Sequence, residues 1–242
     1  MPFFPDKNCL FIHIPKNAGS YIDDYLGLPT GFGLNDSPSD LNKASLIKLI
    51  KKQLFSMPFI ADSSRKKDSR LFAMRKMLFG YFGGGYAFQH STLEELISMR
   101  LVDDALLTDV FCFAIHRHPE ERVKSIYKYW KFYQVMSFEE FCLDVVRTPW
   151  LPNLTHTQLT HLRPQIDFVK INGSIPDYMN MIPMDSLEQF FTLMHKERSW
   201  PSPRNKILNK SDSISIHVSG VARDIIQDRY HDDYRQFGYE ML

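Results

Sequence analysis

The sequence predicts an α/β fold with a central parallel sheet flanked by helices. Two segments, residues 9–26 and 109–130, each contain a short apolar run, a tight turn and then apolar residues at helical spacing. Repeated strand–loop–helix units of this kind build parallel sheets. The chain has 242 residues, 44% of them hydrophobic, which is enough to bury one sizeable core. We therefore expect residues 1–242 to form a single α/β domain.

The first unit begins with residues 9–14 (CLFIHI), which predict a short buried strand. Pro15 and a turn of small residues follow, and Lys16 and Ser20 in this turn offer a cation and a hydroxyl. The start of the next helix supplies unpaired N–H groups, so the turn suits a phosphate. It lacks the Gly-x-x-x-x-Gly-Lys pattern of a Walker A loop. Alone, it fits an ordinary strand–helix turn equally well.

The second unit has a predicted strand at residues 110–115 (VFCFAI), buried on both faces, and a helix starting at Pro119. Arg117 follows the strand directly, and Ser125 lies about two turns into the helix. A guanidinium at a strand end can bind a phosphate through paired hydrogen bonds. Taken individually, Arg117 is typical of an arginine in a surface ion pair, and Ser125 is typical of a helical serine without a functional role. Two such loops at the carboxyl ends of parallel strands favour a ligand site at that edge.

The remaining segments predict more helices and long loops. Residues 80–85 predict a Gly-rich turn, and residues 150–219 are rich in Pro and Asn, which predicts mostly loop. Ser137 and Glu140 have the spacing of a capping box, which predicts that a helix begins there. We expect further helices near residues 45–55, 92–99, 185–195 and 221–237.

Charge is balanced overall but concentrated locally. The chain has 29 Lys plus Arg against 28 Asp plus Glu, so we expect no global attraction to nucleic acid. Residues 43–76 nevertheless contain ten basic and two acidic residues, within a predicted basic helical insertion at about residues 43–80. This segment suits an anionic acceptor or an anionic membrane surface. A solvated helix face with a basic loop is the interpretation we favour.

Targeting and redox signals are few. Cys9, Cys112 and Cys142 lie far apart and form no Cys-x-x-Cys pair, which argues against a disulfide framework or a zinc site. The first residues lack a signal-peptide pattern, and no run approaches the roughly 18 apolar residues of a membrane span. We therefore expect a cytoplasmic protein without a transmembrane segment.

Three stretches resemble one enzyme family. Residues 11–20 (FIHIPKNAGS) resemble the 5′-phosphosulfate loop of sulfotransferases that use 3′-phosphoadenosine-5′-phosphosulfate (PAPS), most closely the carbohydrate sulfotransferase branch and its bacterial relatives. Residues 117–125 (RHPEERVKS) resemble the family's 3′-phosphate motif, and residues 233–239 (DYRQFGY) its C-terminal signature. His118 stands where the family usually has Asp, and Asn17 where Thr is common.

The resemblance implies a P-loop-like core and a PAPS site. The residues that it assigns to this site are Lys16, Asn17, Ala18, Gly19, Ser20, Tyr21, Arg117 and Ser125. Lys16 would contact the 5′-phosphosulfate and stabilise the leaving phosphate. Arg117 and Ser125 would hold the 3′-phosphate.

The resemblance also suggests a base. His90 lies in residues 88–93 (FQHSTL) ahead of a predicted helix, a context similar to that of a catalytic histidine in carbohydrate sulfotransferases. An imidazole near its ordinary pKa suits proton abstraction at neutral pH. Alternatively, His90 caps the helix or binds a backbone carbonyl. Residues 161–165 (HLRPQ) resemble a stretch near the acceptor in some relatives, so His161 and Arg163 are candidate substrate-binding residues and His161 a rival base.

The implied reaction is transfer of a sulfuryl group from PAPS to a hydroxyl of a saccharide or a small hydroxylated metabolite. The product would be 3′-phosphoadenosine-5′-phosphate (PAP), and no metal is required. One alternative is a nucleotide-dependent kinase with a degenerate phosphate loop, against which the missing Walker A pattern argues. Another alternative is a catalytically silent nucleotide-binding module. The presence of Lys16 and His90 argues against it.

Overall fold

The computed structural model describes residues 3–4, 7–26, 90–98, 102–148, 154–203 and 214–241. Their four-stranded sheet has the order β1-β2-β3-β4. The strands are β1 (Phe3–Phe4), β2 (Cys9–Ile12), β3 (Phe111–His116) and β4 (Met179–Pro183). Strands β2, β3 and β4 run parallel, and β1 pairs antiparallel with β2. The predicted α/β fold with a central parallel sheet is confirmed.

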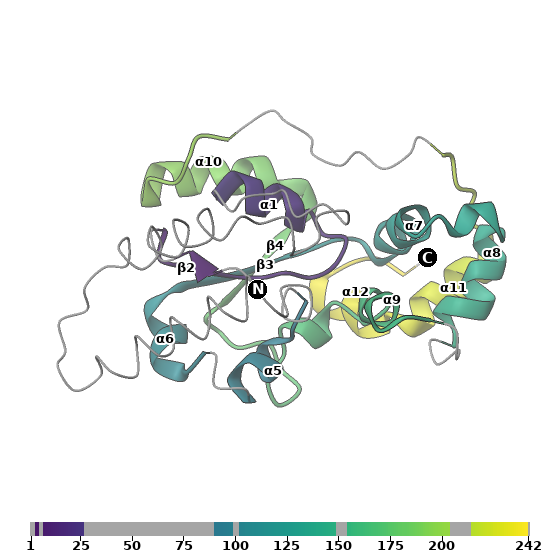
Figure 1. The fold of residues 1–242 in the computed structure, drawn as a ribbon, viewed down its shortest axis with the longest axis horizontal. Coiled ribbons are helices and arrows are strands. Elements are labelled where there is room, and N and C mark those ends of the chain that lie inside the picture. The colour runs from purple at the N-terminus through teal and green to yellow at the C-terminus, as the bar shows by residue number, and fades with distance from the viewer. Residues whose placement is uncertain are drawn as a thin grey trace, which may run out of the picture.

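Helices cover both faces of this sheet (Figure 1). Leu10 and Ile12 of β2 belong to the core that includes α5 (Leu93–Ser98) and α6 (Asp104–Asp109). Their neighbours Cys9 and Phe11 pack on the opposite face, with α1 (Gly19–Leu26) and α10 (Leu187–Arg198). Because alternate side chains of each strand enter different cores, both predicted strands read as continuous apolar runs.

A second group of helices lies beyond the carboxyl ends of β2 and β3 (Figure 1). It has its own apolar core, which includes Val123, Phe141 and Ile226. The predicted capping box at Ser137 and Glu140 is confirmed. The helices of this group are α7 (Pro119–Tyr129), α8 (Phe138–Phe141), the π-helix η4 (Cys142–Val146), α9 (His156–His161), α11 (Gly220–Arg229) and α12 (His231–Phe237). Short 3₁₀ turns at η3 (Phe132–Gln134), η5 (Ile166–Phe168) and η6 (Met184–Ser186) complete the described elements.

Two predictions differ from the structure. The single helix expected at residues 221–237 is divided at Tyr230, where the backbone leaves the helical region. Tyr230 is buried and its hydroxyl donates to the Leu162 carbonyl, so tertiary contacts outweigh the continuous apolar period. Strand β4 lies in the segment expected to be mostly loop, and of its five residues only Met179 is buried.

Several sequence features lie outside the described residues, namely the helix at 45–55, the basic insertion at 43–80 and the Gly-rich turn at 80–85. In the part of the chain that is described, no helix has the length and apolar character needed to cross a membrane.

Candidate functional site

The loop after β2 adopts an unusual backbone conformation. Lys16 and Ala18 have φ angles of 68° and 60°, in the left-handed region that non-glycine residues seldom adopt. Such conformations persist where surrounding contacts fix them. Here Asn17, which is fully buried, donates from Nδ2 to the Ile115 carbonyl at 2.8 Å and so joins the loop to the end of β3. This hydrogen bond holds the loop that carries Lys16 against the end of β3.

Gly19 is required for a reason that the sequence did not reveal. A Cβ atom at this position would lie 1.7 Å from Nε2 of His13. The ring of His13 therefore lies against the Gly19 backbone. His13 is buried, as its place in an apolar run predicts. Glycine here permits the first turn of α1 to pass over the end of β2.

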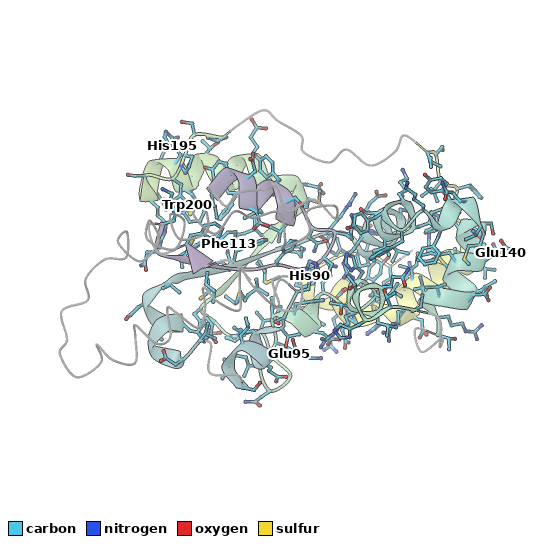
Figure 2. The ribbon with its side chains drawn as sticks, viewed as in Figure 1. His90, Glu95, Phe113, Glu140, His195 and Trp200 are labelled. Atoms are coloured by element: carbon cyan, nitrogen blue, oxygen red, sulfur yellow. The ribbon has the colours of Figure 1, made fainter. Side chains whose placement is uncertain are left out.

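Three histidine rings meet beside this loop. The ring centroids of His13 and His90 are 4.6 Å apart, and those of His90 and His161 are 5.3 Å apart. Figure 2 shows His90 where the sheet meets the second group of helices. Residues from the loop after β2, the segment before α5 and the end of α9 thus form one cluster.

The hydrogen bonds of His90 and His161 define their tautomers. Nδ1 of His90 lies 3.2 Å from the His13 carbonyl oxygen, and Nδ1 of His161 lies 2.7 Å from that of Thr157. A carbonyl only accepts, so in each ring Nδ1 carries the proton and Nε2 keeps its lone pair. Each neutral ring therefore presents the nitrogen that can accept a proton.

Burial keeps these rings neutral. It lowers the pKa of His90 to about 4, against the hydrogen bond to His13, which raises it. It lowers the pKa of His161 to about 3 in the same way. Both lie well below the ordinary histidine value of about 6.5 that the sequence led us to expect. At neutral pH both imidazoles are thus unprotonated and can accept a proton, and each is a weaker base than an ordinary histidine.

Lys16 lies close to this cluster. Its Nζ is 3.7 Å from the centroid of the Tyr129 ring, and that ring stacks on His161 with an interplanar angle of 9°. Burial, and then the positive charge of Arg117, lower the pKa of Lys16 to about 8. The repulsion shows that the two loops bring their cations within electrostatic range of each other. An anion between them would be stabilised by both.

Arg117 is held by a side chain from a distant segment. Gln165, which is fully buried, accepts from the Arg117 backbone N–H at 2.9 Å and donates to its carbonyl at 2.8 Å. The Gln165 Oε1 also accepts from Asn17 Nδ2 at 2.6 Å. Buried Asp233 accepts in turn from the Gln165 backbone N–H at 2.8 Å. One amide therefore fixes both candidate phosphate loops relative to each other.

The side chains of Arg117 and Ser125 share a hollow with a volume of about 130 Å³. The two residues that the second motif singled out are thus brought together. The hollow is lined by Arg117, Glu121, Lys124, Ser125, Lys128 and Ile216. Cationic side chains and a hydroxyl around a small hollow suit a phosphate-sized anion.

Other predicted residues lie less centrally. Ser20 is exposed at the start of α1. The Tyr21 backbone N–H donates to the Ala18 carbonyl, and the Tyr21 ring packs on Tyr25 and Phe191 in the core below α10. The structure therefore does not bring the Tyr21 ring to the histidine cluster.

Arg163 is engaged elsewhere. Its Nη1 lies 3.2 Å from Oε1 of Glu95 on α5, and its guanidinium lies over the Phe168 ring. The partially exposed ion pair gives Arg163 a structural partner. The structure thus groups His161, but not the paired Arg163 guanidinium, with His90.

Sequence reasoning assigned no role to Arg122, although it lies in the second motif. Its buried guanidinium donates to the carbonyls of Pro15, His161 and Arg163 at 3.1, 2.9 and 2.9 Å. It thereby joins the first loop to the segment that carries His161. Gln165 and Asp233 also lie in stretches that resemble the sulfotransferase family, but the sequence assigned neither residue a role. Tyr129 had no sequence signal beyond its place in the α7 helix.

The comparisons with known proteins add no assignment to this geometry. No family model, no curated protein and no solved structure matches the chain.

Proposed function

We propose that this chain is a PAPS-dependent sulfotransferase that transfers a sulfuryl group to a hydroxyl of a saccharide or small hydroxylated metabolite. The observation that carries the proposal is the convergence of two cationic loops at the carboxyl ends of adjacent parallel strands. Lys16 follows β2, Arg117 follows β3, and the charge of one lowers the pKa of the other. Neutral His90 lies beside the Lys16 loop.

The donor site would extend between the two loops. Arg117 and Ser125 would bind the 3′-phosphate in their shared hollow, and Lys16 the 5′-phosphosulfate. The strained backbone of residues 16–18 supports a preformed site for the latter. The donor would supply an activated sulfuryl group. We also propose that the sheet and its two loops form the P-loop-like core that the sequence resemblance implies.

His90 would take the proton of the acceptor hydroxyl. Its Nδ1 is oriented by the His13 carbonyl, so Nε2 is the accepting atom. Lys16 would stabilise the negative charge that develops on the departing phosphate, the task that positioning and electrostatics perform in phosphoryl transfer. His161 lies next to His90 and remains the alternative base. These roles need no metal ion.

The experiment is an acceptor screen with radiolabelled PAPS, on the full chain, with and without a chelator. We expect label on a hydroxyl compound, equally in both conditions. Phosphate transfer from ATP that requires magnesium would identify a kinase instead. Tight PAP binding with no transfer to any saccharide or hydroxylated metabolite would identify a silent nucleotide-binding module.

A further inference from the structure

The hollow beside α7 contains more charge than the second motif explains. Lys124 and Lys128 line it together with Arg117 and Ser125, so three cations and a hydroxyl surround about 130 Å³. Ser125 and Lys128 lie three residues apart along α7 and therefore share a helix face. A phosphate monoester with two negative charges matches this set better than a singly charged group does.

A carboxylate already lies among these cations. Oε2 of Glu121 is 3.7 Å from Nη2 of Arg117, and its Oε1 forms an ion pair with Lys124. Lys124 is also 3.4 Å from Glu120. The Glu121 side chain is about half exposed, so its release into solvent has a small cost. Its carboxylate contacts two of the cations that a bound phosphate would contact.

Lys128 differs from Lys124 in this respect. In the described part of the chain Lys128 forms no ion pair, whereas Lys124 has two. Lys128 is half-buried at the hollow, so its charge is available to an incoming anion. Among the described residues, its substitution would break no ion pair with a carboxylate, so the effect on phosphate binding can be measured directly.

We propose that Lys124 and Lys128 complete the 3′-phosphate site, and that Glu121 occupies it in the free protein as an exchangeable counter-ion. This inference rests on the proposed function. The 3′-phosphate displaces Glu121 from Arg117 and Lys124, and the released carboxylate turns to solvent. Glu121 thereby weakens binding of every ligand at the hollow, and an anion with two charges overcomes this competition best.

The test is calorimetric titration of the full chain with PAP and with AMP, which lacks the 3′-phosphate. Lys128→Met should weaken PAP binding about threefold to tenfold, and Glu121→Gln should strengthen it by a similar factor. Neither substitution should change AMP binding. Lys196→Met on α10 and Glu139→Gln on α8 are exposed controls that should change nothing.

The outcomes separate this inference from the proposed function. If wild-type protein prefers PAP to AMP but both substitutions leave that preference unchanged, Lys128 and Glu121 have no part in the site and only this inference is wrong. Weaker PAP binding by Glu121→Gln would show that the carboxylate orients Arg117 rather than competing with phosphate. Equal affinity of the wild type for PAP and AMP would overturn both the inference and the proposed function.

Discussion

Lys16 combines a strained backbone with a perturbed side chain. Its φ angle is 68°, and burial together with Arg117 lowers its pKa to about 8. The ammonium contacts the Tyr129 ring, an interaction that a bound anion can replace. A lysine with this pKa is mostly protonated at pH 7 and loses its charge in the mildly alkaline range.

We expect Lys16→Ala to lower kcat by about 10²–10³, the usual loss when one charge-stabilising donor is removed. Only the protonated amine stabilises developing negative charge, so wild-type kcat/KM for the donor should fall as pH rises through about 8. Lys16→Arg stays charged throughout this range, so the activity that it keeps should not fall with pH there. Rates of the three proteins between pH 6 and 10 provide the measurement. An unchanged Lys16→Ala rate would remove Lys16 from the mechanism, and the same alkaline fall in Lys16→Arg would assign that fall to another group.

His90 is the proposed base, and its replacement is the matching test. His90→Ala should lower kcat by about 10²–10⁴ while PAP affinity stays nearly constant. Because the pKa of His90 is about 4, the ring is already neutral at pH 6, and wild-type kcat should be flat from pH 6 to 7.5. A rise centred near pH 6.5 would indicate an unperturbed histidine instead. If His161→Ala is inactive while His90→Ala is nearly normal, His161 is the base.

At the scale of elements, buried polar side chains join loops that are distant in the sequence. Arg122 extends from α7 to three carbonyls in two other segments, and Gln165 joins the first loop to the Arg117 backbone. Loops are otherwise the most variable parts of a fold. These contacts hold the two candidate phosphate loops in fixed positions relative to each other.

Replacement of Arg122 should therefore destabilise the protein strongly. Arg122→Met leaves three carbonyls without their donor and should lower the free energy of unfolding by on the order of 3 kcal/mol. Arg223 on α11 is the matched control, because its Nε is 3.5 Å from Glu120 and its side chain is partly exposed. We expect Arg223→Met to cost about 1 kcal/mol or less. Chemical denaturation compares them, and equal losses would show that the Arg122 contacts are not stabilising.

The local elements were largely predictable, whereas their partners were not. Both strand–loop–helix units and the Ser137 capping box follow from short-range periodicity and capping chemistry. The contacts of Gln165 with Arg117 and Asp233 span 48 and 68 residues of sequence, and no local pattern records them. The break at Tyr230 depends likewise on a distant carbonyl. Gln165 and Asp233, which have no distinctive pattern in the sequence, therefore hold the candidate site together through long-range hydrogen bonds.

At the scale of the whole molecule, the candidate site lies at one boundary. The parallel strands end where the second group of helices begins (Figure 1). Lys16 follows β2, Arg117 follows β3, and His90 precedes α5 in the chain. The carboxyl edge of a parallel sheet is the usual ligand site of open α/β folds. The sheet supplies the two loops, and the helices supply Ser125, Tyr129 and His161.

The most direct test of the proposed function is calorimetric titration of the wild-type chain with PAP and AMP under identical conditions. The two ligands differ only in the 3′-phosphate, which Arg117 and Ser125 are proposed to bind. We expect PAP to bind on the order of tenfold or more tightly than AMP, because charge-assisted hydrogen bonds to that phosphate are lost with AMP. Equal affinities would contradict the proposed PAPS site.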